Sequence, residues 1–462
     1  MKSYLSDLNQ NQLQAVKHEN GPMLVFAGAG SGKTRVLTRR ICNLIDENLA
    51  YPENIFAVTF TNKAAKEMKE RVFNMLGRAP RYVSTFHSAC AKILRENARL
   101  IGFRPDFTIY DQKESLATIK RIFKDLRINS KEITPREVQR KIDNAKNNYL
   151  FADHFRESET FYNQEENFII ADVFEAYQQE LKQCNAMDFG DLISQVVTLF
   201  ILEKEVLAKH QKRFKYVLVD EYQDTNLVQY KLLHLLTKET QNLFVVGDDD
   251  QSIYSFRGAN IANIDSFKRD FPDYEVCILD TNYRSTKNIL DAANAVISNN
   301  DSRQKKSLKT DNDQGELVNL KSTECEASEA QFITRTINEA IENKSLALSE
   351  IAIFYRTNAQ SRGLEEELYH QSIPHKIFGG QRFYDRKEIK DIIAYCRLAL
   401  NNDDNESFIR VINVPTRGFG KTSLNHLFKK AKGENISLFK AALTKVAAVS
   451  YTHLTLPTIY SV

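Results

Sequence analysis

Residues Met23–Thr34 read MLVFAGAGSGKT. The apolar run Met23–Phe26 is typical of a buried strand, and a helical pattern follows the glycines and continues to about Asn48. The glycines allow a tight turn in which successive backbone N–H groups point at phosphate oxygens. This order of strand, turn and helix predicts a phosphate-binding loop, and a plain glycine-rich turn is the alternative.

The turn carries the side chains that a nucleotide needs. Lys33 is placed to contact the β- and γ-phosphates, and the Thr34 hydroxyl is placed to ligate Mg²⁺. The helix that begins near Lys33 adds its positive N-terminal end. The common pattern starts with glycine where this chain has alanine, which is a minor departure. The expected nucleotide-binding loop is Ala27, Gly28, Ala29, Gly30, Ser31, Gly32, Lys33 and Thr34.

A second apolar run, Tyr216–Val219, ends in the carboxylates of Asp220 and Glu221. An aspartate at the carboxyl end of a strand suits a Mg²⁺ contact beside a phosphate loop. The following glutamate is placed to orient or deprotonate a water molecule. A strand that ends in Asp-Glu is common by itself, but together with the loop it indicates hydrolysis of ATP or GTP.

Short apolar runs alternate with helical patterns, which predicts an α/β fold with a mostly parallel sheet covered on both faces. From about Gly102 to Met187 the pattern is helical, as in Glu114–Leu126 and Phe168–Gln183, which predicts a helical insertion. Strand patterning then returns in a second α/β unit, and helices resume after Arg386. The expected strands are Met23–Phe26, Ile55–Thr59, Tyr216–Val219, Leu243–Val246, Val276–Leu279, Glu316–Leu320, Ile351–Tyr355 and Lys376–Phe378.

The composition excludes several classes of protein. The 462 residues are 42% hydrophobic and 27% charged, which is typical of a globular chain of several domains and excludes a disordered or collagen-like one. No apolar run reaches the length of a membrane span, and the polar start has no apolar leader segment. The six cysteines are scattered without metal-ligand spacing, which favours a reducing cytoplasm.

Charge is unevenly distributed, although the net charge is only +3. Residues 60–104 contain ten Lys/Arg against three Glu, whereas residues 151–187 contain two Lys/Arg against eight Asp/Glu. Two interpretations of the basic stretch stay open, a solvated helix face and a phosphate-facing surface. Residues 446–462 contain no charged side chain. We expect residues 450–462 to be a non-native tail, with an ordinary C-terminal β-segment as the alternative.

Nine segments together resemble the Rep/UvrD-type superfamily-1 DNA helicases, with the likeness closest to the Rep branch. One such segment would be a weak signal, but nine in order are specific. They are LNQNQ at 8–12, AGAGSGKT at 27–34, TFTNKAAKEMKERV at 59–72, STFHS at 84–88, DFGDLI at 188–193, VDEYQDTN at 219–226, VVGDDDQSIYSFRGA at 245–259, NYRST at 282–286 and YRTNAQSR at 355–362.

The resemblance implies a RecA-like P-loop ATPase fold and ATP bound with Mg²⁺ in a cleft between two α/β domains. It implies that Gln12 recognises adenine, although a surface glutamine that caps a helix is the alternative. Tyr283 would stack on adenine, and Arg35 would flank the base or the phosphates. The implied catalytic residues, which include a γ-phosphate contact and an arginine finger, are Lys33, Asp220, Glu221, Gln251 and Arg284.

The resemblance also implies a track for single-stranded DNA. Aromatic side chains stack on bases at about 1–3 kcal/mol per base and tolerate any sequence. The implied stacking residues are Phe60, Phe189, Tyr254 and Phe256, with core packing as the alternative; the family more often has Trp at position 256. The residues implied to hold phosphates, sugars or base edges are Thr61, Asn62, His87, Arg257 and Asn358.

The expected domain plan follows the family. Residues 1–84 and 190–279 would form the first RecA-like ATPase domain, and residues 85–189 the helical insertion subdomain. Residues 280–380 would begin a second, incomplete RecA-like domain, and residues 381–449 part of a helical subdomain. Two further family motifs are absent, so we expect a truncated chain that hydrolyses ATP poorly and does not unwind duplex DNA.

Three functions stay open at this point. The first is an ATP-dependent helicase or translocase that moves 3′ to 5′ on single-stranded DNA and at single-strand/duplex junctions, with replication or repair proteins as partners. The second is a module that binds nucleotide and single-stranded DNA without productive hydrolysis. The third is another P-loop enzyme, such as a small-molecule kinase, which would ignore DNA.

Overall fold

The computed structural model describes residues 3–129, 133–157, 164–254, 258–300, 306–343, 346–378, 387–417 and 419–446. The chain forms two compact units. One comprises Met1–Glu316 together with Tyr395–Val462, and the other comprises Leu317–Ala394. The expected tail at 450–462 lies outside the described residues. Within the described residues, no helix is both long and apolar enough to cross a membrane.

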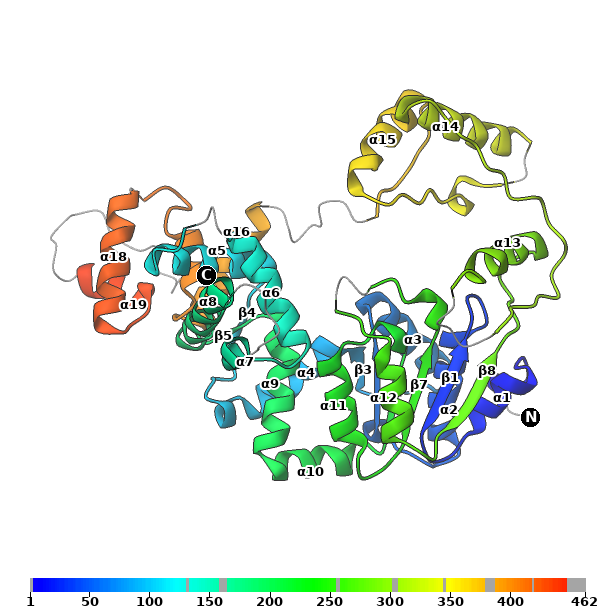
Figure 1. Ribbon diagram of the computed structural model, residues 1–462, viewed down its shortest axis with the longest axis horizontal. Helices are drawn as coiled ribbons and strands as arrows, with labels where there is room; N and C mark the ends of the chain where they lie inside the picture. The colour runs from blue at the N-terminus through cyan, green and yellow to red at the C-terminus, as the bar shows by residue number, and fades with distance from the viewer. Residues whose placement is uncertain are drawn as a thin grey trace. The chain divides into compact units, whose positions relative to one another are not determined.

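A six-stranded parallel sheet lies at the centre of the first unit, in the order β3-β2-β6-β7-β1-β8 (Figure 1). Its inner strands are buried along their whole length, as expected for short apolar strands that helices cover on both faces. The sheet confirms the α/β prediction. The strands are β1 (Met23–Ala27), β2 (Ile55–Thr59), β3 (Tyr82–Thr85), β6 (Tyr216–Val219), β7 (Leu243–Gly247) and β8 (Glu275–Leu279).

Alternate strand residues feed two hydrophobic cores, one on each face of the sheet. Leu24 and Phe26 of β1 belong to one core, whereas Met23 and Val25 belong to the other. The helices of the second face are α1 (Gln10–Lys17), α2 (Lys33–Asp46) and α3 (Asn62–Leu76). Those of the first face are α4 (Phe86–Asn97), α9 (Phe189–Leu202), α10 (Lys204–Arg213), α11 (Leu227–Thr237) and α12 (Ala262–Asp270). After β8 comes α13 (Lys287–Ile297).

The expected helical insertion is present between β3 and β6 and has a hydrophobic core of its own. Its helices are α5 (Gln112–Asp125), α6 (Pro135–Asn147), α7 (Ala152–Glu157) and α8 (Gln164–Gln183). Sequence patterning missed strand β3 of the central sheet. It also missed the short parallel pair β4 (Thr108–Ile109) and β5 (Ala186–Met187), because two residues are too few to show a period.

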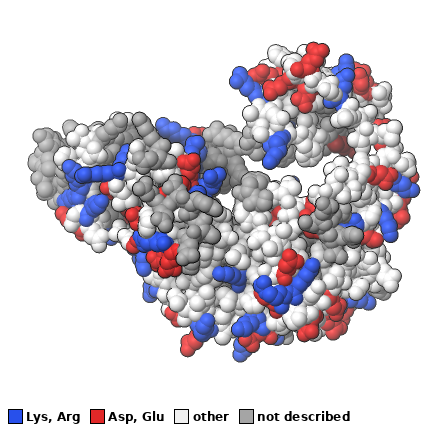
Figure 2. Space-filling view, in the orientation of Figure 1, with Lys and Arg blue, Asp and Glu red and all other residues white. Residues whose placement is uncertain are grey.

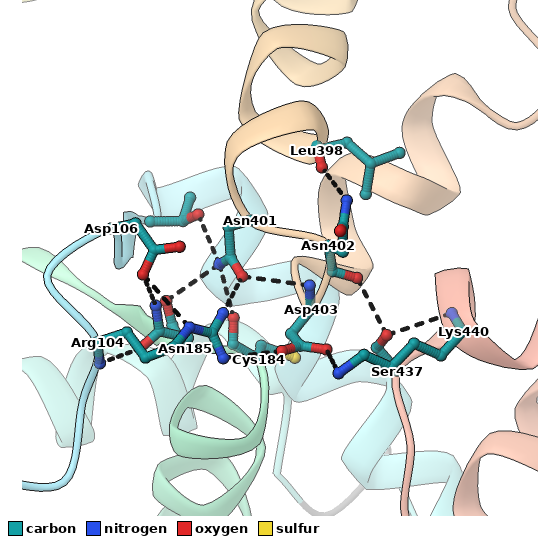
Figure 3. Close-up of polar contacts among 11 residues, drawn as sticks. Arg104, Asp106, Cys184, Asn185, Leu398, Asn401, Asn402, Asp403, Ser437 and Lys440 are labelled. Atoms are coloured by element: carbon teal, nitrogen blue, oxygen red, sulfur yellow. Dashed lines mark hydrogen bonds and ion pairs between the residues drawn. The ribbon is translucent and has the colours of Figure 1, made fainter. Parts of the chain in front are cut away.

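Polar contacts attach the C-terminal helices to this insertion (Figure 3). The Asn401 amide is buried; its nitrogen donates to Thr108 Oγ1 at 3.1 Å and to the Cys184 carbonyl at 3.0 Å. Its oxygen accepts from Arg104 Nη2 at 2.7 Å, and Arg104 also pairs with Asp403 at 2.9 Å. Helices after Arg386 confirm the prediction for this region. They are α16 (Lys387–Leu400), α17 (Asn405–Val411), α18 (Lys421–Glu434) and α19 (Leu438–Val446).

Within the described residues, the second unit contains α14 (Glu326–Glu342) and α15 (Ser361–His370), which pack through Ile337 and Leu368, together with the first part of α16 up to Ala394. The strands expected at 316–320, 351–355 and 376–378 are wrong, because none of the described residues there forms a strand. Leu320 is fully exposed and Phe354 is 93% exposed. An alternating sequence supplies a face to bury, but a strand also needs a neighbour for its backbone hydrogen bonds.

We predict that Asn401→Ala loosens the attachment of the C-terminal helices. The substitution removes the donor to the buried Cys184 carbonyl and one of the acceptors of Arg104, at a cost of about 1–3 kcal/mol. Thermal denaturation should show the loss, and amide exchange should increase in α17 and around β5. The matched control is Asn402→Ala next to it, since Asn402 is exposed and bonds within its own region, to the Leu398 carbonyl. Equal melting temperatures for both variants would contradict the prediction.

Candidate nucleotide site and nucleic-acid cleft

The phosphate loop connects β1 to α2 as the sequence predicts. The Gly28 N–H donates to the Leu279 carbonyl of β8 at 3.2 Å, and Ser31 Oγ donates to the Gly28 carbonyl at 2.7 Å. Gly30 and Gly32 have φ values of +68° and +91°, which favour glycine. Gly32 caps α2, so Lys33 and Thr34 are its first two residues.

The ammonium nitrogen of Lys33 is buried beside two carboxylates from neighbouring strand ends. It lies 3.3 Å from Glu221 Oε2 and 3.9 Å from Asp248 Oδ2. Among the described residues, however, it has no hydrogen-bond partner. A buried cation in this state fits an anionic ligand, because phosphate oxygens can supply the hydrogen bonds that the carboxylates do not.

Asp220 and Glu221 follow β6, where the sequence predicts them. The Glu221 N–H donates to Asp220 Oδ1 at 3.1 Å. Burial, and then the Glu221 carboxylate, raise the pKa of Asp220 to about 7, while Lys33 opposes the rise. Glu221 has a φ of +50°, and strained backbone of this kind is often found at functional sites.

Gln223 was missed by sequence reasoning, although it lies in the quoted VDEYQDTN segment. Its amide nitrogen donates to Glu221 Oε2 at 3.0 Å, and its amide oxygen accepts from the Asp248 N–H at 2.9 Å. Gln223 therefore connects the segments that follow β6 and β7, whose carboxylates Glu221 and Asp248 lie near Lys33. Only the folded chain brings these groups together, so the sequence carried no signal for the contact.

Asp248 is a second residue that sequence reasoning missed. Its carboxylate accepts from Gln251 Nε2 at 2.5 Å and lies 2.7 Å from Lys306 Nζ. Lys306 also pairs with Asp249 and lies 3.4 Å from Asp250. These three aspartates have a geometry that could hold a metal ion, but the ammonium of Lys306 already lies among them. Asp248 thus lies between Lys33 and Gln251, the expected γ-phosphate contact.

Gln12 is buried, and both ends of its amide are engaged. Its nitrogen donates to the Ser31 carbonyl at 2.8 Å, and its oxygen accepts from the Asn9 N–H at 3.2 Å. Gln12 therefore belongs to the capping box of α1, as the alternative interpretation held, but it lies against the phosphate loop and not on the surface. Its recognition of adenine stays a prediction.

Tyr283 and Arg284 lie beside the phosphate loop and in the same compact unit. The Tyr283 N–H donates to the Gly30 carbonyl at 3.0 Å, and the Arg35 guanidinium lies 6.0 Å from the Tyr283 ring. Asn282, which sequence reasoning did not single out, donates from its amide to the Ala29 carbonyl at 2.6 Å. Arg284 is exposed and has no ion-pair partner among the described residues. The residues expected around the base and γ-phosphate thus gather at this loop.

A separate cleft of about 1180 Å³ brings together four residues expected to contact DNA, namely Phe60, His87, Phe189 and Tyr254. The Phe60 and Tyr254 rings stack 5.4 Å apart, and the His87 ring meets Phe189 edge-on at 5.7 Å. Phe60 is 39% exposed and Phe189 is 49% exposed, so neither is a core residue. Burial lowers the pKa of His87, which keeps its imidazole neutral at neutral pH.

Other expected DNA contacts are less defined. The Thr61 hydroxyl caps α3 by accepting from the Ala64 N–H at 3.1 Å, and Asn62 accepts from the Thr85 hydroxyl at 3.3 Å. Phe256, Arg257 and the Asn358 side chain lie outside the described residues.

The cleft lining carries both signs of charge. It includes the bases Arg140 and Lys141, but also acids such as Asp111, Asp143 and Asp224. The basic stretch 60–104 contributes Phe60 and His87 to the lining and none of its Lys or Arg residues. On the face shown in Figure 2, acidic and basic side chains are likewise interspersed. A phosphate-facing role for the basic stretch stays a prediction.

We predict that Asp143→Asn stabilises the protein at alkaline pH. Burial, and then the Asp188 carboxylate, raise the pKa of Asp143 to about 7. Between about pH 4 and pH 7 the folded state therefore binds more protons than the unfolded state, and stability falls as the pH rises. Asparagine stays neutral, so the variant should gain on the order of 1–2 kcal/mol at pH 8 and little near pH 4. Thermal melts across this pH range measure the difference, with the exposed Asp273→Asn as control. A gain that is the same at both pH values would refute the prediction.

Two known protein families match successive parts of the chain. Residues 8–272 match the UvrD/REP helicase N-terminal domain, and residues 277–455 match the UvrD-like helicase C-terminal domain. The chain is 47% identical over 440 residues to the ATP-dependent DNA helicase PcrA of Bacillus subtilis (strain 168), which covers 95% of this chain and 59% of that protein. It is 45% identical over 444 residues to PcrA of Leuconostoc citreum, covering 96% of this chain and 59% of the relative.

A third relative, PcrA of Staphylococcus aureus (strain Mu50 / ATCC 700699), is 46% identical over 444 residues, which cover 96% of this chain and 60% of the relative. This chain thus spans less than two thirds of the length of these relatives. The narrower expectation of a likeness closest to the Rep branch is not confirmed, since all three carry the name PcrA. With the two domain matches and this level of identity, the chain belongs to the UvrD/Rep family of helicases.

Proposed function

We propose that this chain carries the ATP- and DNA-binding sites of an ATP-dependent DNA helicase or translocase, with ATP bound at the phosphate loop and single-stranded DNA bound in the aromatic cleft. The family membership supports this activity, as do the names of the relatives, which are ATP-dependent DNA helicases. The family likeness also supports movement 3′ to 5′, action at single-strand/duplex junctions, a cytoplasmic location and replication or repair proteins as partners.

One observation carries the proposal, which is the short connection between the two sites. Asp248 lies 3.9 Å from the Lys33 ammonium and accepts a hydrogen bond from Gln251. Gln251 begins a segment that reaches Tyr254 three residues later, and the Tyr254 ring stacks on Phe60 in the cleft. A phosphate that competes for Lys33 and Gln251 would change the position of this segment, which is how a ligand shifts a two-state element.

The residues present also fit the expected nucleotide chemistry. The buried Lys33 ammonium would bind the phosphates, and Glu221 would orient the attacking water. Thr34 and Asp220 would hold Mg²⁺, which supplies positive charge against the developing phosphate charge. Asp220 suits this role because its carboxyl is buried, and burial raises its pKa although the nearby Lys33 opposes the rise. Arg284, which is exposed beside Gly30, would reach the γ-phosphate as an arginine finger.

The proposal predicts ATP turnover that depends on single-stranded DNA. We expect an oligo-dT strand to raise the rate of phosphate release by the purified chain, and Lys33→Ala to abolish both nucleotide binding and turnover. The exposed Lys17→Ala serves as the matched control and should keep the parent rate.

Phe60→Ala should weaken oligo-dT binding by about 1–3 kcal/mol, measured by fluorescence anisotropy, and leave nucleotide affinity unchanged. A chain that hydrolyses ATP with equal rates in the presence and absence of oligo-dT would not be a DNA motor.

A further inference from the structure

A buried lysine lies directly beneath one of the cleft residues. Lys146, near the end of α6, is only 2% exposed. Its ammonium lies 2.6 Å from Asp188 Oδ2 and 2.8 Å from Asp191 Oδ1. Its charge also lies 5.0 Å from the centre of the Tyr177 ring, and the Tyr177 hydroxyl donates to Asp188 at 3.0 Å. The nucleotide site described above does not use this group.

The two aspartates lie on either side of Phe189 in the sequence, and Phe189 is the first residue of α9. Asp188 Oδ1 accepts from the Asp191 N–H at 2.9 Å, and Asp191 Oδ2 accepts from the Asp188 N–H at 3.1 Å. This reciprocal capping box fixes the backbone on both sides of Phe189. Lys146 forms an ion pair with each of the two buried carboxylates, which would otherwise repel each other.

The stem of Lys146 contacts the same turn. A Cβ atom added at Gly190 would lie 2.9 Å from Lys146 Cδ, so the lysine packs closely against the backbone that follows Phe189. The Phe189 ring itself projects into the cleft, half exposed and edge-on to His87. The lysine thus fixes the base of the side chain and leaves its ring surface free for a ligand.

The neighbouring Asn147 connects this arrangement to the nucleotide side. Its amide oxygen accepts from Asn226 Nδ2 at 2.9 Å, and Asn226 caps α11 shortly after Glu221. A Cβ atom added at Gly258 would lie 3.3 Å from the Asn147 amide. The end of α6 therefore contacts three segments that carry expected site residues.

Stability alone is a weak explanation for this cluster. A buried cation with two carboxylates contributes little to folding compared with apolar residues of the same volume, since all three groups lose their hydration. What such a network provides is a fixed geometry. We infer that Lys146 is a positioning residue for single-stranded DNA, which holds Phe189 in the orientation that stacks on a base. This inference rests on the proposed DNA-binding function and adds a residue to it.

The test compares the affinity of the full chain and its variants for fluorescein-labelled oligo-dT. Lys146→Met removes the ammonium but keeps most of the stem, and it should weaken oligo-dT binding by about 5- to 150-fold, the range for one lost base stack. Nucleotide affinity should stay at the parent value. Combining Lys146→Met with Phe189→Ala should add no further loss to that of Phe189→Ala, because both substitutions remove the same stack.

A second variant covers the case in which Lys146→Met folds poorly. Lys146→Met with Asp191→Asn removes one of the two carboxylates that the lysine pairs, and it should show the same loss of oligo-dT affinity. The matched control is Arg121→Met, since Arg121 also pairs with two carboxylates, Glu180 and Glu406, but neither of them flanks a residue that lines the cleft. It should lower the melting temperature and keep oligo-dT affinity.

The outcomes separate the inference from the function on which it rests. Parent-like oligo-dT affinity in Lys146→Met, or a loss that adds in full to that of Phe189→Ala, overturns the positioning role. An equal loss in Arg121→Met overturns it as well, because general destabilisation would then explain the effect. A parent chain that does not bind oligo-dT overturns the proposed function itself.

Discussion

The buried ammonium of Lys33 is the group around which the first unit is arranged. It lies at the end of a loop that starts from β1, and its two carboxylate neighbours, Glu221 and Asp248, follow β6 and β7. These strands are adjacent and parallel, so their carboxyl ends meet at one edge of the sheet. A parallel sheet therefore places a cation and two anions together although they are far apart in the chain, and it is this edge where α/β folds bind ligands.

Two short routes lead from that edge to the aromatic cleft. One runs through Asp248 and Gln251 to Tyr254. The other runs from Glu221 through the α11 cap Asn226 to Asn147 and so to the turn that carries Phe189. Each route contains one part-buried side-chain hydrogen bond, from Gln251 to Asp248 in the first and from Asn226 to Asn147 in the second, and otherwise follows the chain. The proposed nucleotide and DNA sites, connected in this way, would exchange free energy through small shifts in position.

The sequence predicted those features that a local pattern encodes. The β1–loop–α2 unit, the Asp220–Glu221 strand end and the helical insertion all appear where the periodicity and the glycines indicated. The contacts of Gln223, Lys306 and Lys146 could not be predicted, because each depends on partners that only the folded chain brings near. The prediction of strands in the second unit was wrong for a related reason, because a strand forms only where a neighbouring strand supplies backbone hydrogen bonds, and an alternating sequence pattern does not show that neighbour.

The mixed charge of the cleft also bears on how it would hold DNA. Acids such as Asp111 and Asp224 lie in the same lining as Arg140 and Lys141, so the walls offer little net attraction to a phosphate backbone. The stacking rings Phe60 and Tyr254 and the half-exposed Phe189 must then supply most of the local binding energy. Stacking depends steeply on ring orientation, whereas attraction between charges does not. A cleft of this composition therefore depends on rigid support for its rings, and the buried network beneath Phe189 meets that requirement.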